Sequence, residues 1–372
     1  MNLQGQADAA VLLTERLMTR SRFIISLIAS LLIGAVLLFF AARELDFEQL
    51  ESFLRGADWG RLALGLAGYC GLFGVVHAVR TWRWLYLVRP LGEVRAWTVI
   101  RAGLIGFAAI ILLPFRLGEL VRPYVLSRET SIPMSAALGT VVVERVIDGL
   151  FITLLLFLTL WTYDGGASTT FATSLGLVSL CVFTGALGVC VLALWKRSLA
   201  TNLVARVVGW VSPSIAGKLV GMLGTFIDGI GAMRGARDLL PFLGLTLAYW
   251  TVNGLSIAFF GAWAFGLGLT PWAGMTLLAI LVVGIMIPAG PGLAGNYEFF
   301  ALQALALFEP AGTVAAVGGA FVAAMHIGQF VTQVAPGLVL VWWPRRDGSR
   351  LGLWALSRAA RTAAEEQAEQ RG

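Results

Sequence analysis

Apolar runs long enough to cross a lipid bilayer fill most of this chain and limit what it can fold into. A membrane-spanning helix needs about 20 predominantly apolar residues. Apolar runs, some of them shorter than this length, lie at 23–42, 62–88, 97–113, 133–162, 171–195, 240–266, 272–287, 297–308 and 313–343. Only 13% of the residues are charged, against about 25% in soluble domains. The sequence excludes a water-soluble enzyme and predicts an all-α polytopic membrane protein with about 7–8 spans.

The positions of Lys and Arg predict the orientation, because these residues favour the cytoplasmic side when they occur in short connections. We expect a multi-pass protein of the cell (inner) membrane with both termini cytoplasmic. The first apolar run is too long for the core of a signal peptide, so we expect an uncleaved anchor. The predicted parts are a cytoplasmic N-terminus at 1–22, a transmembrane domain at 23–343 and a cytoplasmic tail at 344–372.

The number of crossings predicts that one apolar run does not span the membrane. Basic residues place 89–96 inside, and the absence of Lys and Arg places 163–170 outside. The chain must cross an odd number of times between them, yet the two runs 97–113 and 133–162 intervene. We expect the shorter run, 97–113, to dip into the membrane and return to the side from which it came.

A second segment resembles this one and enters from the opposite side. Trp97–Pro114 and Trp272–Pro288 both end in three aliphatic residues and a Pro. After the second, the Pro-Gly-rich stretch 288–295 cannot stay helical. We therefore expect two broken or re-entrant elements and an inverted repeat, with chance similarity between apolar segments as the alternative. Corresponding breaks in two halves point to the binding site of a transporter.

Two further segments have amphipathic helical spacing. Apolar residues recur every three or four positions within 215–233, and more weakly at Phe47, Leu50 and Phe53. We expect both segments to be interfacial helices that cover the bundle.

Ionisable residues near or within the apolar runs are the candidate substrate-binding residues, because charges are costly there. Arg80 and Arg83 lie near the cytoplasmic end of one run, where anchoring at the headgroups is as good an interpretation as substrate contact. Arg116, Glu119 and Arg122 are spaced to share a helix face. They form either an anion site with spare guanidinium donors or a self-satisfied cluster that pins the loop.

A third group, Glu144, Arg145 and Asp148, forms a polar patch in the run 133–162. Counting residues from one end of this run places Glu144 near the bilayer midplane, and counting from the other end places it at the interface. Both depths stay open. The late break adds Pro288, Gly290, Asn296 and Glu298 to the candidates, and other polar residues lie within apolar runs at Asn253, His326, Gln329 and Gln333.

No catalytic or cofactor-binding motif accompanies these residues. The two His have no metal-ligand spacing, and the Gly-rich run does not follow a strand. We therefore expect no metal and no cofactor. Whether the chain is an enzyme stays open, although the missing motifs favour a role without catalysis. The Arg lie mainly in short connections rather than in a basic stripe, so we expect no nucleic-acid partner.

Three motifs carry a resemblance to a known family: Arg80-x-x-Arg83-Trp84, Leu113-Pro114-Phe115-Arg116-Leu117-Gly118-Glu119-x-x-Arg122, and Glu144-Arg145-x-x-Asp148. With the late Pro-Gly turn, they resemble the transmembrane domain of lysylphosphatidylglycerol synthases and of stand-alone flippase-like membrane proteins, over about residues 20–343. The resemblance implies a flippase-like fold with re-entrant helices. Because the tail after Trp343 is too short for the aminoacyltransferase domain of the bifunctional synthases, lysyl transfer is not expected.

These observations lead to one functional hypothesis and two alternatives. The hypothesis is a flippase-like transporter that moves or binds an anionic phospholipid or prenyl-phosphate lipid, with Arg donors on the phosphate and Glu119, Glu144 and Asp148 as orienting or proton-linked acids. The alternatives are a membrane-embedded transferase acting on a lipid-linked substrate, and a non-transporting accessory subunit of envelope biosynthesis. A homo-oligomer or a lipid-modifying enzyme partner would fit any of the three.

Overall fold

The computed structural model describes residues 20–113, 118–161, 166–209, 213–231, 235–287 and 290–343, and these parts are helical with short connections. Each predicted apolar run forms a helix. These are α2 (Arg20–Arg43), α4 (Trp59–Val88), α5 (Ala96–Leu112), α7 (Met134–Trp161), α8 (Gly166–Trp195), α11 (Ala236–Phe265), α12 (Pro271–Ile285), α13 (Asn296–Leu305) and α15 (Gly319–Trp342). The prediction of an all-α polytopic protein is confirmed. Within the described ranges, four helical stretches are long and apolar enough to cross a membrane: 59–91, 170–195, 237–265 and 311–342.

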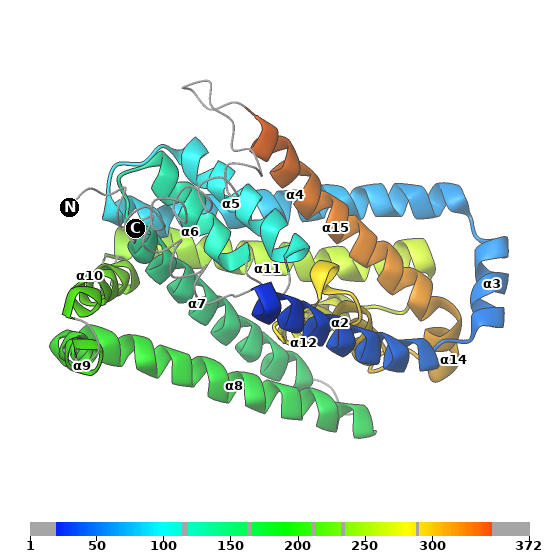
Figure 1. The fold of residues 1–372 in the computed structure, drawn as a ribbon. Helices are drawn as coiled ribbons and strands as arrows, with labels where there is room; N and C mark the ends of the chain where they lie inside the picture. Colours follow the sequence, from blue (N-terminus) through cyan, green and yellow to red (C-terminus); the bar gives the residue numbers. More distant parts are fainter. Residues whose placement is uncertain are drawn as a thin grey trace.

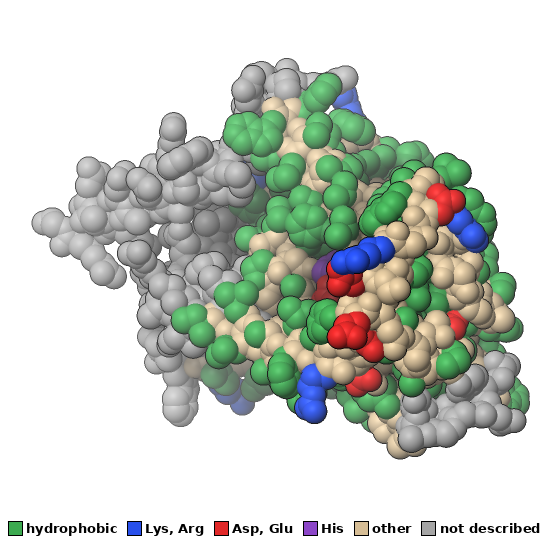
Figure 2. Space-filling model, turned by 90° about the vertical axis from the view of Figure 1, so that its right-hand side faces the viewer, with side chains coloured by type: hydrophobic (Ala, Val, Ile, Leu, Met, Phe, Trp, Pro, Cys, Tyr) green, Lys and Arg blue, Asp and Glu red, His purple; other side chains and the backbone are tan. Residues whose placement is uncertain are grey.

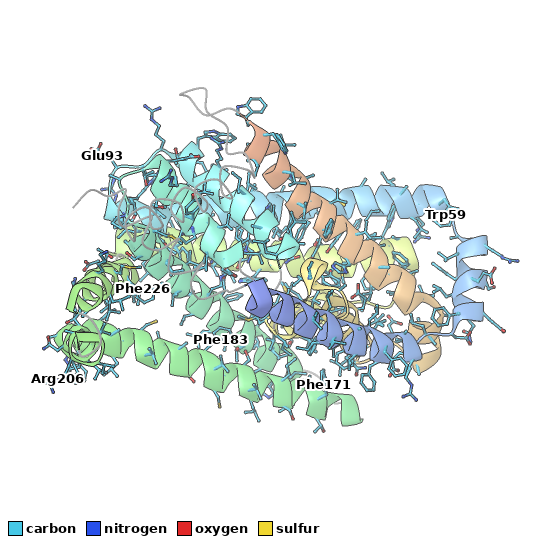
Figure 3. All side chains as sticks on the ribbon, in the orientation of Figure 1. Trp59, Glu93, Phe171, Phe183, Arg206 and Phe226 are labelled. Atoms are coloured by element: carbon cyan, nitrogen blue, oxygen red, sulfur yellow. The ribbon has the colours of Figure 1, made fainter. Side chains whose placement is uncertain are left out.

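The long helices form a bundle whose two ends are capped by crosswise helices (Figure 1). The predicted amphipathic segment 215–233 lies largely within α10 (Pro213–Ile230), which with α9 (Arg197–Gly209) crosses one end, hereafter the α10 end. The other predicted segment is α3 (Phe47–Gly56), which crosses the opposite α3 end. Figure 3 places Glu93 and Arg206 at the α10 end and Trp59 at the other.

The surface of the bundle suits a lipid environment. Exposed Trp side chains occur at both ends, as in the aromatic belts of membrane proteins: Trp59, Trp161 and Trp272 toward the α3 end, and Trp97, Trp195 and Trp343 toward the α10 end. Between the ends, α8 exposes aliphatic residues such as Val178, Val182 and Val189. Figure 2 looks onto the α3 end, where acidic and basic side chains gather on a largely hydrophobic surface.

Two antiparallel helices, α4 and α11, pack against each other along the bundle. Near the α3 end the ring of Tyr69 stacks on that of Phe260 with centroids 5.0 Å apart. Near the other end Arg83 of α4 donates to the hydroxyl of Thr246 of α11 at 2.7 Å. The same two helices therefore join an aromatic core on one side to a polar cluster on the other.

The first predicted break joins α5 to α6 (Gly118–Glu129), and the two helices pack against each other as a hairpin. Gly118 allows this close approach, because a Cβ there would collide with the backbone of Ile110. The open end of the hairpin lies at the α10 end, where Val99 and Leu126 share a core with the last turn of α4. The first hairpin therefore begins and ends at the same end of the bundle.

The second break joins α12 to α13 and forms a hairpin that points the other way. Its open end lies at the α3 end, where the Gly268 N–H donates to Glu309 at 2.6 Å and Leu305 packs in the core with Phe321. The loop between the arms includes the turn Pro291–Leu293, with Gly292 and Gly295 at φ 75° and 86°, which favours glycine.

The tips of the two hairpins meet inside the bundle. The turn Pro291–Leu293 packs against α5, and residues from both tips line one cavity. The two hairpins thus point toward each other from opposite ends of the bundle. Pro114, Arg116 and Pro288 of these breaks lie outside the described residues.

A close contact between α7 and α10 gives the first prediction. A Cβ on Gly229 would collide with the carbonyl of Ala136, whereas one on Gly221 of the same helix meets nothing within 4 Å. We expect Gly229→Ala to destabilise the protein by about 1–3 kcal/mol through overpacking. The matched change Gly221→Ala should be neutral or stabilising, since Ala has the higher helix propensity. Thermal unfolding in detergent measures both, and equal melting temperatures would contradict the contact.

Candidate functional site

A buried network of guanidinium and carboxylate groups joins four helices toward the α10 end. Glu144 of α7 is fully buried and accepts hydrogen bonds from three Arg. Arg83 of α4 and Arg145 donate to its Oε1 at 3.1 and 2.7 Å, and Arg122 of α6 donates to its Oε2 at 2.5 Å. The carboxylate therefore ties the first hairpin to α4 and α7.

Asp148 extends the network to α11. Its Oδ2 lies 2.6 Å from Arg83 and 3.2 Å from Arg145, and its Oδ1 accepts the hydroxyl of Tyr249 at 2.8 Å. Arg83 thus contacts two carboxylates and the hydroxyl of Thr246. Buried charges persist in proteins only when they are paired and hydrogen-bonded, and both acids meet this condition.

Aromatic rings enclose the guanidinium groups. Arg122 lies 4.3 Å from the ring centroid of Trp84, and Arg83 lies 4.7 Å from that of Tyr249. The guanidinium group is more weakly hydrated than an ammonium and stacks on aromatic faces, so this shell suits Arg better than Lys. The rings shield the network from water.

Arg80 differs from the other three Arg of this region. Its guanidinium lies 4.2 Å over the ring of Phe107, and it has no ion pair within the described ranges. Glu119 of α6 lies near enough to attract Arg145 electrostatically. Among the described residues here, four guanidinium groups (Arg80, Arg83, Arg122 and Arg145) face three carboxylates (Glu119, Glu144 and Asp148), which leaves one net positive charge.

A cavity of about 80 Å³ lies beside the network, between the tips of the two hairpins. One water-sized group needs roughly 10–15 Å³ of such space, so several fit. The charged lining consists of Arg80, Arg145 and Asp148. Uncharged polar lining comes from Trp250, Asn253, Gln329 and Gln333, and apolar residues of both hairpins complete the wall: Ile110, Ile111, Ile285, Met286 and Leu293.

Two of the candidates from the second break, Asn296 and Glu298, stabilise its loop and do not line this cavity. Glu298 accepts the Gly295 N–H at 2.7 Å, and its other oxygen lies 2.6 Å from Nδ1 of His326. Nε2 of His326 lies 2.8 Å from the Gly292 carbonyl, and Asn296 donates to the Ile287 carbonyl at 3.1 Å. Gly290 precedes the turn in an extended conformation.

The structure shows where three of these residues lie in the bundle. Arg83 is fully buried in the network. Arg122 pairs with Glu144 of another helix. Glu144 lies toward the α10 end, since Thr140, one turn earlier, bonds to Trp84 near the end of α4.

Three site residues on α11 escaped the sequence analysis: Thr246, Tyr249 and Trp250. A signal for the first two was present, because Thr246, Tyr249 and Asn253 recur at helical spacing within an otherwise apolar run. Thr and Tyr are common enough in membrane helices for this spacing to carry little weight alone.

Comparison with known proteins agrees with this architecture. A family model described as the lysylphosphatidylglycerol synthase TM region matches residues 27–337. The chain belongs to this family. The match includes both hairpins and every described residue of the network. It shows a membrane domain, as the apolar helices also indicate.

One curated relative is the glycosyltransferase AglD of Haloferax volcanii. It is 26% identical over 328 residues, which cover 78% of this chain and 51% of the relative. The lysylphosphatidylglycerol synthase TM region described here thus spans about half the length of that protein. No solved structure matches the chain.

The network predicts a large difference between two Glu→Gln changes. Glu144→Gln leaves buried guanidinium groups without a counter-charge, and breaking a buried ion pair costs about 3–5 kcal/mol. Glu51→Gln removes the partner of Arg55 in a pair exposed on α3 and should cost less than about 1 kcal/mol. Chemical or thermal unfolding in detergent compares the two variants. Similar losses of stability would mean that the network does not hold the hairpin.

Proposed function

We propose that this protein is a flippase-like transporter of the cell membrane that binds and moves a lipid with an anionic phosphate headgroup. One observation carries the proposal: a cavity with an excess guanidinium group lies where two oppositely inserted hairpins meet. Breaks in membrane helices are tolerated where they line such a cavity, and they mark the binding site in transporters.

The charges at the cavity favour an anion. Arg83 and Arg122 are occupied by Glu144 and Asp148 and form the framework. Arg80 has no carboxylate partner in the described part of the chain, and Arg145 lies at the cavity with its side chain partly exposed. Guanidinium groups bind phosphate oxygens in a planar, bidentate manner. A phosphate between Arg80 and Arg145 would supply the missing negative charge, with the acids orienting the donors.

The two hairpins would give the lipid headgroup access to the cavity from both sides of the membrane. In this proposal each hairpin is re-entrant, so its tip reaches the middle of the membrane from one side only. A movement of one tip relative to the other would open the cavity to one side at a time, while the lipid tails remain in the bilayer. The charged headgroup then avoids hydrocarbon during the passage.

The family supports a lipid context, and the name of the relative supports the competing function. A transferase would consume a donor molecule, whereas a transporter changes only the location of its lipid. Incubation of the detergent-solubilised protein with a lipid-linked sugar donor distinguishes them, since release of the donor's leaving group would favour the transferase.

Transport in liposomes tests the proposal through Arg80. We expect reconstituted protein to accelerate the exchange of a tail-labelled phosphatidylglycerol between leaflets, and Arg80→Gln to lower that rate about tenfold or more, as for the loss of a charged hydrogen bond. Arg89→Gln is the matched control, because Arg89 is exposed at the end of the same helix. A membrane-impermeant quencher measures the exchange rate, because labelled lipid is protected from it only while that lipid stays in the inner leaflet.

Two results would contradict the transporter. One is an exchange rate equal to that of protein-free liposomes for phosphatidylglycerol and for a prenyl-phosphate lipid. The other is equal activity of Arg80→Gln and Arg89→Gln, because the excess guanidinium would then play no part.

Cysteine labelling tests whether the hairpins are re-entrant. In a cysteine-free background, Cys at Glu93 and Ser131 should react from one side of the membrane, and Cys at Glu48 and Ala311 from the other. The first pair flanks the hairpin α5–α6, so shared accessibility means that the hairpin returns to its side of entry. Labelling of Ser131→Cys from the side of Glu48→Cys would show instead that one arm spans the membrane.

A further inference from the structure

Buried polar atoms without hydrogen-bond partners converge on the cavity. Among the described residues, Nε1 of Trp250 and Oδ1 of Asn253 have no partner, although these residues are only 4% and 5% exposed. The Nε atoms of Arg80 and Arg145 are also unpaired. All four residues line the same cavity. Because an unpaired buried polar atom is costly, these four atoms on one cavity point to a ligand that completes the bonds.

The cavity lining has two chemically distinct parts. One part is cationic and comprises Arg80 and Arg145 beside Asp148. The other is neutral and comprises the indole of Trp250 with the amides of Asn253, Gln329 and Gln333, which come from α11 and α15. All four neutral side chains are at least nine-tenths buried. We call this second set the amide pole.

We infer that the headgroup is a phosphate that carries an uncharged, hydroxylated group, such as a sugar or a polyol. This inference rests on the proposed function and narrows its substrate. Hydroxyl groups both donate and accept, so they match an indole donor and amides that offer both roles. The cationic part would hold the phosphate and the amide pole the hydroxyls. The space for several water-sized groups fits a small headgroup of this kind.

The same cavity disfavours a headgroup with an amine, such as an aminoacyl ester. Both oxygens of Asp148 are already engaged, by Tyr249 and by two Arg. Glu298 is bound to Gly295 and His326 and does not line the cavity. In the described part of the chain, no other carboxylate lines it, so an ammonium would lie near guanidinium groups without a counter-charge.

Binding to the full chain in detergent tests the inference without requiring transport. The probes are short-chain phosphatidic acid, phosphatidylglycerol, phosphatidylinositol, phosphatidylethanolamine and lysyl-phosphatidylglycerol, together with a short prenyl phosphate with and without a linked glucose. Isothermal titration calorimetry gives each Kd. We expect hydroxylated headgroups to bind about tenfold more tightly than their bare phosphate counterparts or the amine-bearing lipids. The phosphoglyceride and prenyl series distinguish a polyol source from a sugar source.

Paired variants separate the two parts of the cavity. Asn253→Leu and Gln333→Leu should weaken binding of the hydroxylated probes about three- to tenfold each and leave the bare phosphates unchanged. Arg80→Gln should weaken every phosphate probe. Gln303→Leu on α13, outside the cavity lining, is the matched control for loss of an amide.

The outcomes distinguish a failure of this inference from a failure of the proposed function. Equal binding of bare and hydroxylated phosphates, unaffected by Asn253→Leu, would overturn the inference and leave an anionic-lipid site. Preference for lysyl-phosphatidylglycerol would also overturn it. If no phosphate lipid binds and Arg80→Gln has no effect, both the inference and the proposed function fail.

Discussion

The fold depends on the need to pair charges that are buried away from water. Glu144 and Asp148 hold Arg83, Arg122 and Arg145 at hydrogen-bonding distance, and these groups come from three helices. Tyr249 adds a fourth helix. Removal of one member would leave the other buried charges without a counter-charge. The network therefore fixes the first hairpin against the bundle.

The loop of the second hairpin is fastened by weaker polar contacts than the ion pairs that hold the first hairpin, and this difference bears on movement. Its loop is fastened by Glu298 and His326, which are half-buried, and by backbone groups of Gly292 and Gly295. Replacing the hydrogen bonds of this loop by hydrogen bonds to water costs less free energy than separating ion pairs inside the protein. If one tip moves during transport, the restraints favour the tip of the second hairpin, with the first acting as the fixed half of the site.

The sequence predicted the helices because hydropathy, Pro and Gly act locally. Parity of crossings, which depends only on loop charges, led to the expectation of a re-entrant first hairpin, and this stays a prediction. The pairing of Arg122 with Glu144 could not be predicted in this way. Local spacing relates a residue to its own helix, whereas Arg122, Glu144 and Tyr249 meet only after three helices have packed.

In the proposed function, headgroup selectivity and structural support reside largely on different helices. The ion-pair network lies mainly on α4, α6 and α7, whereas the amide pole comes from α11 and α15. A substitution in the amide pole exchanges one uncharged side chain for another and leaves the ion pairs of the network intact. The same pair of hairpins could therefore accept different headgroups on a phosphate without loss of the fold. A carboxylate in place of Gln333 would then be the smallest change that admits an amine.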